Sequence, residues 1–489
     1  MTAVMEIMQA TVGDWDRSKR PPMWSLCKVA ARAAVVTAML AGGGAGCTAS
    51  GEDVAPDRLD IFFPTGAVVS PDGKQLFVVN SNSDLKYSSG SISVVPLEAV
   101  DALIAQWLPA RTNVPAACRQ DLDFHETLIC NEQMFLSETQ DQGVRIGNFA
   151  TDIALQDLSN GDLRLIVPTR GDPSIAWADW SAAEGRLSCN DKNLAEPFHT
   201  CDGAHRLSFV GNDDTAAAIP DEPFGVFADT AGEFAIVTHL TTGAVTLIDS
   251  PRAGTVQVAD IQQNVFLQDP TSGLRGATGV AGRTPHAAGD IVYVGSRSED
   301  RIQTFTVGRH PPPAEGDVYK PPFLLTGNWF FQDGVGNNAN TNSGANDTRG
   351  MAFSSSGDRL FLLNRKPPTL QILDTSLGAT GVPKNQLVGA VDICRQASTV
   401  TVVDSGEGDR AYLTCFQDGQ IYVVDPRGRG RVEDVITVGR GPYSITGTPD
   451  GQRLFVTNFL EDTIAVIDLT PGSPTRNRVV LRIGEPRPL

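Results

Sequence analysis

Few residues of this chain have the types and spacing that catalysis or metal binding needs. The six histidines are His125, His199, His205, His239, His286 and His310. None forms the H-E-x-x-H pair of a zinc protease or belongs with a G-x-S-x-G nucleophile turn. His199 and His205 flank Cys201, which leaves metal binding open, although loop histidines are more often not ligands. The sequence therefore predicts no catalytic residue, no metal and no cofactor.

Cysteine chemistry is better represented. Apart from Cys27 and Cys47, the chain has six cysteines that fall into three pairs close in sequence. The pairs are Cys118 with Cys130, Cys189 with Cys201, and Cys394 with Cys415. None has the C-x-x-C spacing of a metal or haem site, so pairing in sequence order as disulfides is the simplest hypothesis. Disulfides indicate an oxidising compartment.

One aromatic and polar stretch has the residue types for ligand binding. Trp329, Phe330 and Phe331 precede Asp333 in "GNWFFQDGVGNNANTNSGANDT", which we expect to be a loop. The aromatic rings could stack on a sugar or contact a protein, with Asn and Asp side chains as hydrogen-bond partners. The alternative is an aromatic anchor that holds a long loop against the domain. Calcium binding would use Asp333 and Asp347, but no EF-hand spacing is present.

A repeated β-rich unit must position these residues. The segment 439–472, "GRGPYSITGTPDGQRLFVTNFLEDTIAVIDLTPG", predicts three antiparallel strands with a Pro-Asp-Gly turn between the first two. Similar units occur at 64–97, 148–180, 223–250, 276–308, 349–376 and 398–426. Several are followed by a fourth β-like run, such as "EDVITVGRGP". Seven four-stranded sheets close best as a radial array, so the sequence predicts an all-β, seven-bladed β-propeller of antiparallel blades.

The repeat also resembles a known family. "FVTNFLEDTIAVID" and "FVVNSNSD", each after "PDG", resemble the bacterial YVTN-type β-propeller repeat, and the resemblance covers about residues 61–484. Some units depart from it, because His239, Ser296 and Cys415 replace the Asn after the second strand. The resemblance implies a scaffold that surface-layer proteins and lactonase-like enzymes share, and it does not imply one activity.

The N-terminus has the pattern of an export signal. Lys28 and Arg32 precede a short apolar run and then small residues that end at Cys47. We therefore expect residues 1–46 to be a signal segment, with Met23 as a possible true start. The apolar run is too short to span a bilayer.

"GAGC" at the end of this segment resembles the lipobox of bacterial lipoproteins, although Gly44 replaces the usual Leu. The resemblance implies lipid attachment at Cys47, and Thr48 in place of Asp implies the outer membrane. Residues 47–58 are then a flexible tether. The alternative is an ordinary secretory signal in which Cys47 occurs by chance.

Charge limits the partners. With 39 basic and 57 acidic residues, the chain has a formal net charge of −18. Such an acidic body repels nucleic acid and anionic membrane surfaces. We therefore expect no nucleic-acid partner, and membrane attachment only through the N-terminal lipid.

Three insertions interrupt the propeller, which we expect to occupy residues 59–489. They lie near 97–143, 177–205 and 309–347, and the first begins with a helical pattern, "LEAVDALIAQWL". We expect the first two cysteine pairs to close loops that protrude from their blades. Residues 478–484 should be the outermost strand of the last blade, or should pair with residues near 59–63.

Some polar residues recur from unit to unit and are expected to be structural. Asp249, Asp374, Asp425 and Asp468 end the third strand of their units. A position that repeats in this way predicts turn capping rather than one active site. His239, at the place of the turn Asn, should likewise have a structural role.

Two function classes remain open. The first is a lipid-anchored, non-catalytic binding or scaffold protein whose loop face contacts a protein or glycan. The second is a lactonase-like propeller hydrolase or isomerase, which needs a polar cluster of His, Asp, Glu or Arg around the central channel. A buried acidic or histidine cluster at one channel mouth would favour the enzyme. An apolar or Asn-lined mouth would favour binding.

Overall fold

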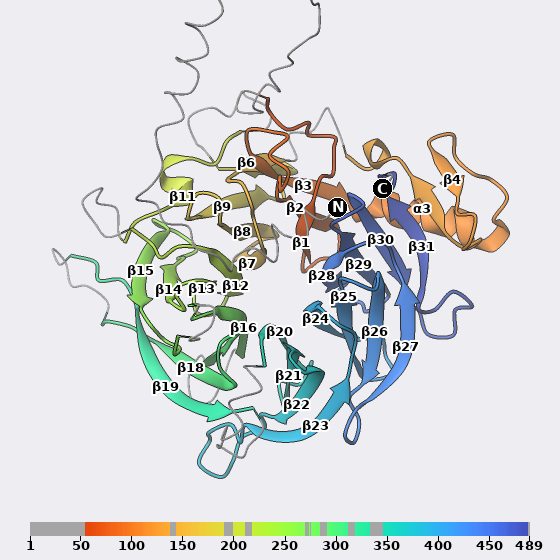
Figure 1. Ribbon diagram of the computed structural model, residues 1–489. Helices are drawn as coiled ribbons and strands as arrows, with labels where there is room; N and C mark the ends of the chain where they lie inside the picture. Colours follow the sequence, from red (N-terminus) through yellow and green to blue (C-terminus); the bar gives the residue numbers. More distant parts are fainter. Residues whose placement is uncertain are drawn as a thin grey trace, which may run out of the picture.

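The chain folds into seven antiparallel β-sheets arranged in a ring (Figure 1). The structure is a computed structural model that describes residues 54–136, 143–189, 199–210, 218–268, 273, 275–283, 291–311, 318–332 and 346–487. The predicted seven-bladed propeller is confirmed, and each predicted unit contributes the inner strands of one blade.

Each blade consists of four consecutive strands, from the axis outward. Blade 1 contains β1 (Pro64–Val69), β2 (Gln75–Asn80), β3 (Gly90–Pro96) and β6 (Val144–Ile146). Blade 2 contains β7 (Ala154–Ser159), β8 (Asp162–Thr169), β9 (Ser174–Ser181) and β10 (Arg186–Ser188), with β11 (Arg206–Leu207) also paired to β9. Blade 3 contains β12 (Pro223–Asp229), β13 (Phe234–His239), β14 (Val245–Asp249) and β15 (Gln257–Gln262).

The remaining blades follow the same order. Blade 4 contains β16 (Ala277–Arg283), β17 (Ile291–Ser296), β18 (Arg301–Gly308) and β19 (Phe323–Phe331). Blade 5 contains β20 (Thr348–Phe353), β21 (Arg359–Arg365), β22 (Pro368–Asp374) and β23 (Gln386–Asp392). Blade 6 contains β24 (Ala397–Asp404), β25 (Asp409–Cys415), β26 (Gln420–Asp425) and β27 (Arg431–Thr437). Blade 7 contains β28 (Pro442–Gly447), β29 (Arg453–Asn458), β30 (Thr463–Asp468) and β31 (Arg478–Ile483).

The apolar core lies between neighbouring blades, because both faces of each sheet are covered. One cluster joins Tyr412 and Val423 of blade 6 to Leu454 and Val456 of blade 7. Strand alternation supplies both faces, with successive side chains directed to opposite sides. Burial on both faces explains why the inner strands are rich in Val, Ile, Leu and Phe.

The first insertion closes the ring. As predicted, β31 is the outermost of blade 7's own strands, and residues near 59–63 are not its partner. Instead β5 (Leu128–Cys130) pairs in parallel with β31, and β4 (Cys118–Gln120) pairs with β5 (Figure 1). Both strands come from the insertion of blade 1, so that insertion adds a hairpin to the outer edge of blade 7. The expectation that it protrudes freely is wrong, since an open strand edge favours strand addition.

The same insertion also contributes a helix and a short 3₁₀ turn. As predicted, a helix begins the insertion, and it is α3 (Leu97–Ala110). One face of α3, including Trp107 and Ile104, is buried in the core shared by blades 1 and 7. η3 (Glu132–Met134) follows the hairpin. The first insertion is therefore packed along its described length.

The second insertion also contacts a neighbouring blade. Thr200 forms a parallel bridge with Arg145 in β6, and Cys201 N–H donates to the Arg145 carbonyl at 2.8 Å. The Cys189–Cys201 disulfide therefore links blade 2 to the edge of blade 1, and the expectation of a free loop is wrong here too. A second 3₁₀ turn, η4 (Gly203–His205), follows.

All three disulfides predicted from sequence order are present. For Cys394 and Cys415 the Cα atoms are 5.7 Å apart, within the range that a disulfide requires. No described helix is long and apolar enough to cross a membrane. Among the residues that the structure describes, no group of three or more His, Cys, Asp or Glu side chains could hold a metal ion.

Candidate functional site

A cavity of about 150 Å³ opens at the mouth of the central channel. Residues from all seven blades line it, and most come from the start of an innermost strand or the end of a second strand. They include Thr65, Thr151, Asp152, Arg170, Phe224, Thr278, Arg297, Arg349, Arg365, Ser398 and Tyr443. The composition of this ring decides which ligands the channel can hold.

A seven-fold backbone feature builds the mouth. The residue just before each inner strand segment has a positive φ, between 45° and 65°, in every blade. These residues are Phe63, Phe149, Glu222, Gly276, Asp347, Gln396 and Gly441. Five of them are neither Gly nor Asn, although this left-handed conformation is uncommon for such side chains. The turn is therefore imposed by the blade geometry, and the side chain at this position is free to vary.

The residue after each second strand lies beside this turn. In six blades its backbone N–H donates to the carbonyl of the left-handed residue, at 2.9 to 3.2 Å. The seven residues are Ser81, Arg170, Leu240, Arg297, Arg365, Phe416 and Phe459. The fold thus brings three arginines, from blades 2, 4 and 5, to the same level of the channel. Arg349, near the start of β20, adds a fourth guanidinium to the cavity lining.

Two carboxylates from the left-handed positions partly balance this charge. Glu222 accepts from Arg170 at 2.5 Å, and Asp347 lies 2.7 Å from Arg349. Burial acts to raise the pKa of Asp347, but Arg349, Arg365 and Arg297 together hold it below its ordinary value. Because Asp347 stays ionised, Arg349 is neutralised at neutral pH.

Arg297 has no such partner. Among the described residues its guanidinium makes no hydrogen bond and no ion pair, although it lines the cavity. Burial, and then the neighbouring Arg349, lower its pKa. Its side chain passes over Gly276, where any Cβ would overlap the Arg297 side chain. A buried cation without a counter-ion is costly, so the site is incomplete without an anion.

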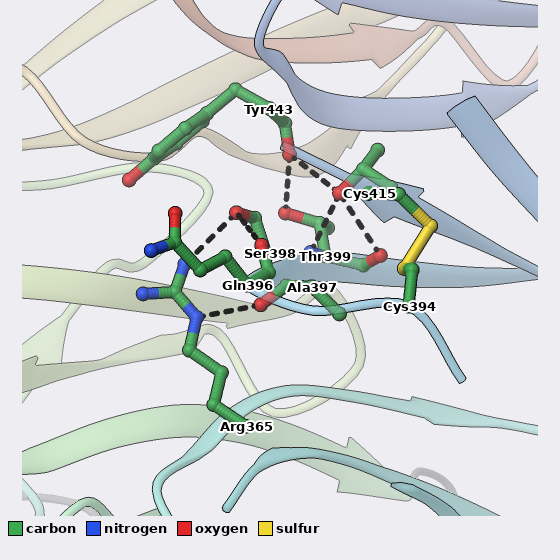
Figure 2. Close-up of a disulfide and its surroundings, with 9 residues drawn as sticks. Arg365, Cys394, Gln396, Ala397, Ser398, Thr399, Cys415 and Tyr443 are labelled. Atoms are coloured by element: carbon green, nitrogen blue, oxygen red, sulfur yellow. Dashed lines mark hydrogen bonds between the residues drawn. A yellow bond between two sulfur atoms is a disulfide. The ribbon is translucent and has the colours of Figure 1, made fainter. Parts of the chain in front are cut away.

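Arg365 is fixed in direction by its neighbours. Its Nε donates to the Ala397 carbonyl at 2.7 Å and one Nη donates to Ser398 Oγ at 3.0 Å. Burial, and then Arg349, lower its pKa to about 9. Figure 2 shows the Tyr443 ring, the Gln396 amide and the Arg365 guanidinium directed to the same side. The Tyr443 hydroxyl has no hydrogen-bond partner among the described residues, so it remains available to a ligand.

Asp152 is the remaining acid of the cavity. Burial raises its pKa to about 6, although it accepts from the N–H groups of Ile153 and Val226. Ser444 of blade 7 occupies the equivalent position and accepts from Ala67 N–H of the next blade at 3.1 Å. The bond from Asp152 to Val226 is therefore a blade-to-blade link that a serine also makes. Its charge is not needed for that link.

The opposite arc of the mouth is aromatic. Phe459 contacts Phe63, with ring centroids 5.2 Å apart, and also packs near Tyr443 and Phe416. These residues belong to blades 6, 7 and 1 or directly precede them. The mouth therefore has a cationic arc on blades 2, 4 and 5 and an aromatic arc on blades 6, 7 and 1.

The residues singled out from the sequence lie elsewhere. Trp329, Phe330 and Phe331 end β19, the outer strand of blade 4, and so they are in a strand rather than the expected loop. Trp329 is 52% exposed and contacts Phe331. Asp333 and Cys47 lie outside the described residues. The proposed partner loop therefore stays a prediction.

The expected structural roles are visible at the repeated aspartates. Asp374, Asp425 and Asp468 each accept from the backbone N–H two residues later, at 2.9 to 3.0 Å. Asp249 instead accepts from the Tyr319 hydroxyl at 2.8 Å. Turn capping is therefore what most of these aspartates do.

The histidines are likewise structural. His239 is buried, 2.7 Å from Thr246 Oγ1, and burial lowers its pKa to about 4. His199 lies 2.7 Å from Arg186, and His205 stacks on Trp177. No described histidine lines the cavity.

Sequence reasoning missed the arginines, although a signal was present. They directly follow the second strand in "VPTR", "VGSR" and "LLNR", at the place of Phe459 in "VTNF". The mouth is neither acidic nor Asn-lined, so neither expected composition was right. Aligning the seven units position by position would have placed three arginines on one ring.

Comparison with known proteins adds the fold alone. No protein-family model matches the sequence, and no curated protein is significantly similar to it. The chain is similar in structure to the Kuenenia stuttgartiensis hydrazine synthase, with 12% identity, a TM-score of 0.46, and coverage of 88% of this chain and 100% of that chain. A putative 6-phosphogluconolactonase from Bacteroides fragilis is 13% identical, with a TM-score of 0.47 and coverage of 70% and 89%. The periplasmic gluconolactonase of Pseudomonas aeruginosa is 15% identical, with a TM-score of 0.42 and coverage of 77% and 86%.

Proposed function

We propose that this propeller binds a small anionic ligand, a carboxylate or an oxyanion, at the mouth of its central channel. The observation that supports this proposal is Arg297, a largely buried guanidinium with no acid or carbonyl partner among the described residues. Arg170 and Arg349 are balanced by Glu222 and Asp347, which leaves Arg297 and Arg365 to attract the ligand. Guanidinium groups suit planar, two-oxygen anions because their N–H groups form a fixed fork.

The size of the cavity limits the ligand. A volume of about 150 Å³ accommodates a molecule of a few heavy atoms and excludes a large oligosaccharide or a folded protein domain. Tyr443 and Phe224 in the wall add apolar contact for a short carbon chain. The binding class is therefore retained, with a small anion as the channel ligand.

Calorimetric titration tests this proposal with sulfate and succinate, and with neutral succinamide as the size-matched comparison. We expect both anions to bind and succinamide not to bind. Arg297→Gln should weaken sulfate binding at least about tenfold, since a hydrogen bond to a charged group contributes about 1.5–3 kcal/mol. Arg429→Gln, at an exposed arginine between β26 and β27, is the matched control. Equal affinity in the Arg297 variant and wild type would rule out this site.

A lactonase-like enzyme is the second candidate, because Asp152 lies in the same cavity. A carboxyl group with a pKa of about 6 suits a general base near neutral pH. The test is hydrolysis of an aldonolactone, followed by proton release in wild type and Asp152→Asn. A rate above the uncatalysed reaction that the variant loses would support the enzyme. No acceleration by wild type would exclude it for that substrate.

We further propose that the propeller is an exported lipoprotein of the outer membrane, held by lipid on Cys47. The motif around Cys47 and the three disulfides support export. Labelling with a fatty acid should mark wild type and not Cys47→Ser. A protein or glycan partner at Trp329 on the outer edge of blade 4 stays a separate hypothesis.

A further inference from the structure

We propose that the Cys394–Cys415 disulfide is a positioning element of the anion site, acting through Arg365. This inference rests on the proposed anion binding. It assigns to one disulfide an effect on ligand affinity, beyond its contribution to stability. The other two disulfides, which join neighbouring blades at their outer edges, have no such role.

The disulfide anchors the segment that holds Arg365. Cys394 precedes β24 and Cys415 ends β25, and Ala397 is the register partner of Cys415. The intervening residues, Gln396 to Ser398, supply the carbonyl and the hydroxyl that accept from Arg365 at 2.7 and 3.0 Å. Figure 2 shows the disulfide on one side of this segment and the Arg365 guanidinium on the other. The segment is thus fixed by a covalent bond at one end and orients the arginine at the other.

Tyr443 depends on the same segment. The Thr399 hydroxyl donates to the Tyr443 carbonyl at 2.7 Å, and the Thr414 hydroxyl donates to the same carbonyl at 3.2 Å. Thr414 directly precedes Cys415, so both hydroxyls come from strands that the disulfide joins (Figure 2). Two cavity-lining residues from different blades, Arg365 and Tyr443, are therefore positioned by one cross-linked strand pair.

Burial makes this disulfide a permanent brace rather than a redox switch. Cys415 is fully buried and Cys394 is 5% exposed, in the core between blades 5 and 6. Exchange requires a thiolate to reach a sulfur atom, and here the sulfur atoms are covered. The orientation of Arg365 should therefore stay constant while the protein is folded.

The test compares two double variants in sulfate titrations. Cys394→Ala/Cys415→Ala should keep the circular dichroism of wild type but bind sulfate about three- to tenfold more weakly. Cys118→Ala/Cys130→Ala, which removes a disulfide remote from the cavity, should bind sulfate like wild type. Equal sulfate affinity of wild type and the 394/415 variant would overturn the inference.

A mutant cycle separates positioning from general loosening. In the Arg365→Ala background, loss of the 394–415 disulfide should have no additional effect on affinity, because the residue it orients is absent. In the Arg297→Gln background its effect should persist, and equal effects in both backgrounds would overturn the inference. If the disulfide variant does not fold, Ser398→Ala removes the acceptor of Arg365 alone and should weaken sulfate binding. Wild type that binds no anion would instead overturn the proposed function, and this inference with it.

Discussion

At the scale of single residues, the binding site depends on one absent side chain. Gly276 has a φ of 60°, and Arg297 occupies the space that its Cβ would fill. In five other blades the equivalent residue carries a side chain, so the left-handed turn itself does not require glycine. The requirement at position 276 comes from the packing of the arginine.

Gly276→Ala should therefore displace Arg297 and weaken sulfate binding about tenfold, measured by calorimetry. The strained φ should also cost about 1 kcal/mol of unfolding free energy. Gly441→Ala in blade 7 has the same backbone conformation without an arginine neighbour, and it is the matched control. We expect it to lose stability and keep affinity. Similar affinity losses in both variants would show that backbone strain, not Arg297, is responsible.

Asp152 gives the site a pH dependence. Its pKa is raised from 3.8 to about 6, so the folded state holds the proton more tightly than the unfolded state. Its contribution to stability is fully present below pH 3.8 and is lost as the pH rises through about 6. Over the same range the cavity gains a negative charge, which opposes anion binding.

Sulfate affinity should therefore fall between pH 5 and pH 7.5, a range over which sulfate itself stays dianionic, and Asp152→Asn should flatten this profile. Asp462, whose pKa burial also raises to about 6, lies outside the cavity lining. Asp462→Asn is thus the control that retains the pH dependence. A profile that stays steep in the Asp152 variant would assign it to another group.

At the scale of elements, local pattern predicted the blades and failed for the insertions. The turn at Pro449-Asp450-Gly451 and the runs RLFVT and TIAVID specify a hairpin within a few residues, and the structure forms it as β29 and β30. The pairing of β5 with β31 joins residues more than 350 positions apart. No local pattern encodes such a contact. It follows from the open edge of blade 7, which only the closed ring defines.

The first insertion should determine how firmly the ring is closed. Removing the Cys118–Cys130 disulfide should lower the free energy of unfolding by about 3 kcal/mol, the usual contribution of a loop of this length. Hydrogen exchange should become faster in β31 and β1, because the hairpin that joins blades 1 and 7 is loosened. Exchange in β20 and β21, on the far side of the ring, serves as the internal control. Protection that changes equally in all blades would contradict a local role in closure.

The candidate site was partly readable for a related reason. Register fixes which residue follows each second strand, so the arginines of "VPTR", "VGSR" and "LLNR" could be assigned to one level. Their counter-ions could not, because Glu222 and Asp347 come from the turns before the next or the same inner strand. Whether Arg297 is paired depends on these contacts across blades.

At the scale of the whole molecule, charge is distributed unevenly. The chain has a formal net charge of −18, yet the cavity concentrates four arginines against Glu222, Asp347 and Asp152. An acidic surface discourages large anions such as nucleic acid, whereas a recessed cationic cavity still admits small ones. The two features together favour a small ligand over a polyanion.

The proposed anchor would also orient this cavity. Ser88, in the turn between β2 and β3, donates its N–H to the Val54 carbonyl at 2.8 Å. Turns between second and third strands surround the cavity, since Arg170, Arg297 and Arg365 begin them. The described chain therefore starts on the face that carries the mouth. Seven residues separate Cys47 from Val54, a reach of at most about 25 Å.

We therefore predict that the lipidated protein holds the mouth of its channel toward the membrane. The test uses Leu85→Cys, exposed on the mouth face, and Gln452→Cys, exposed in the turn between β28 and β29 on the opposite face. Each variant carries a donor dye and is inserted in vesicles with an acceptor dye on the lipid headgroups. Energy transfer should be stronger from position 85, because a tether of about 25 Å cannot extend past the propeller to turn its other face inward. Cys47→Ser, which lacks the lipid, should show transfer from neither position. Stronger transfer from position 452 would contradict this orientation, and would place the anion site on the face turned away from the membrane.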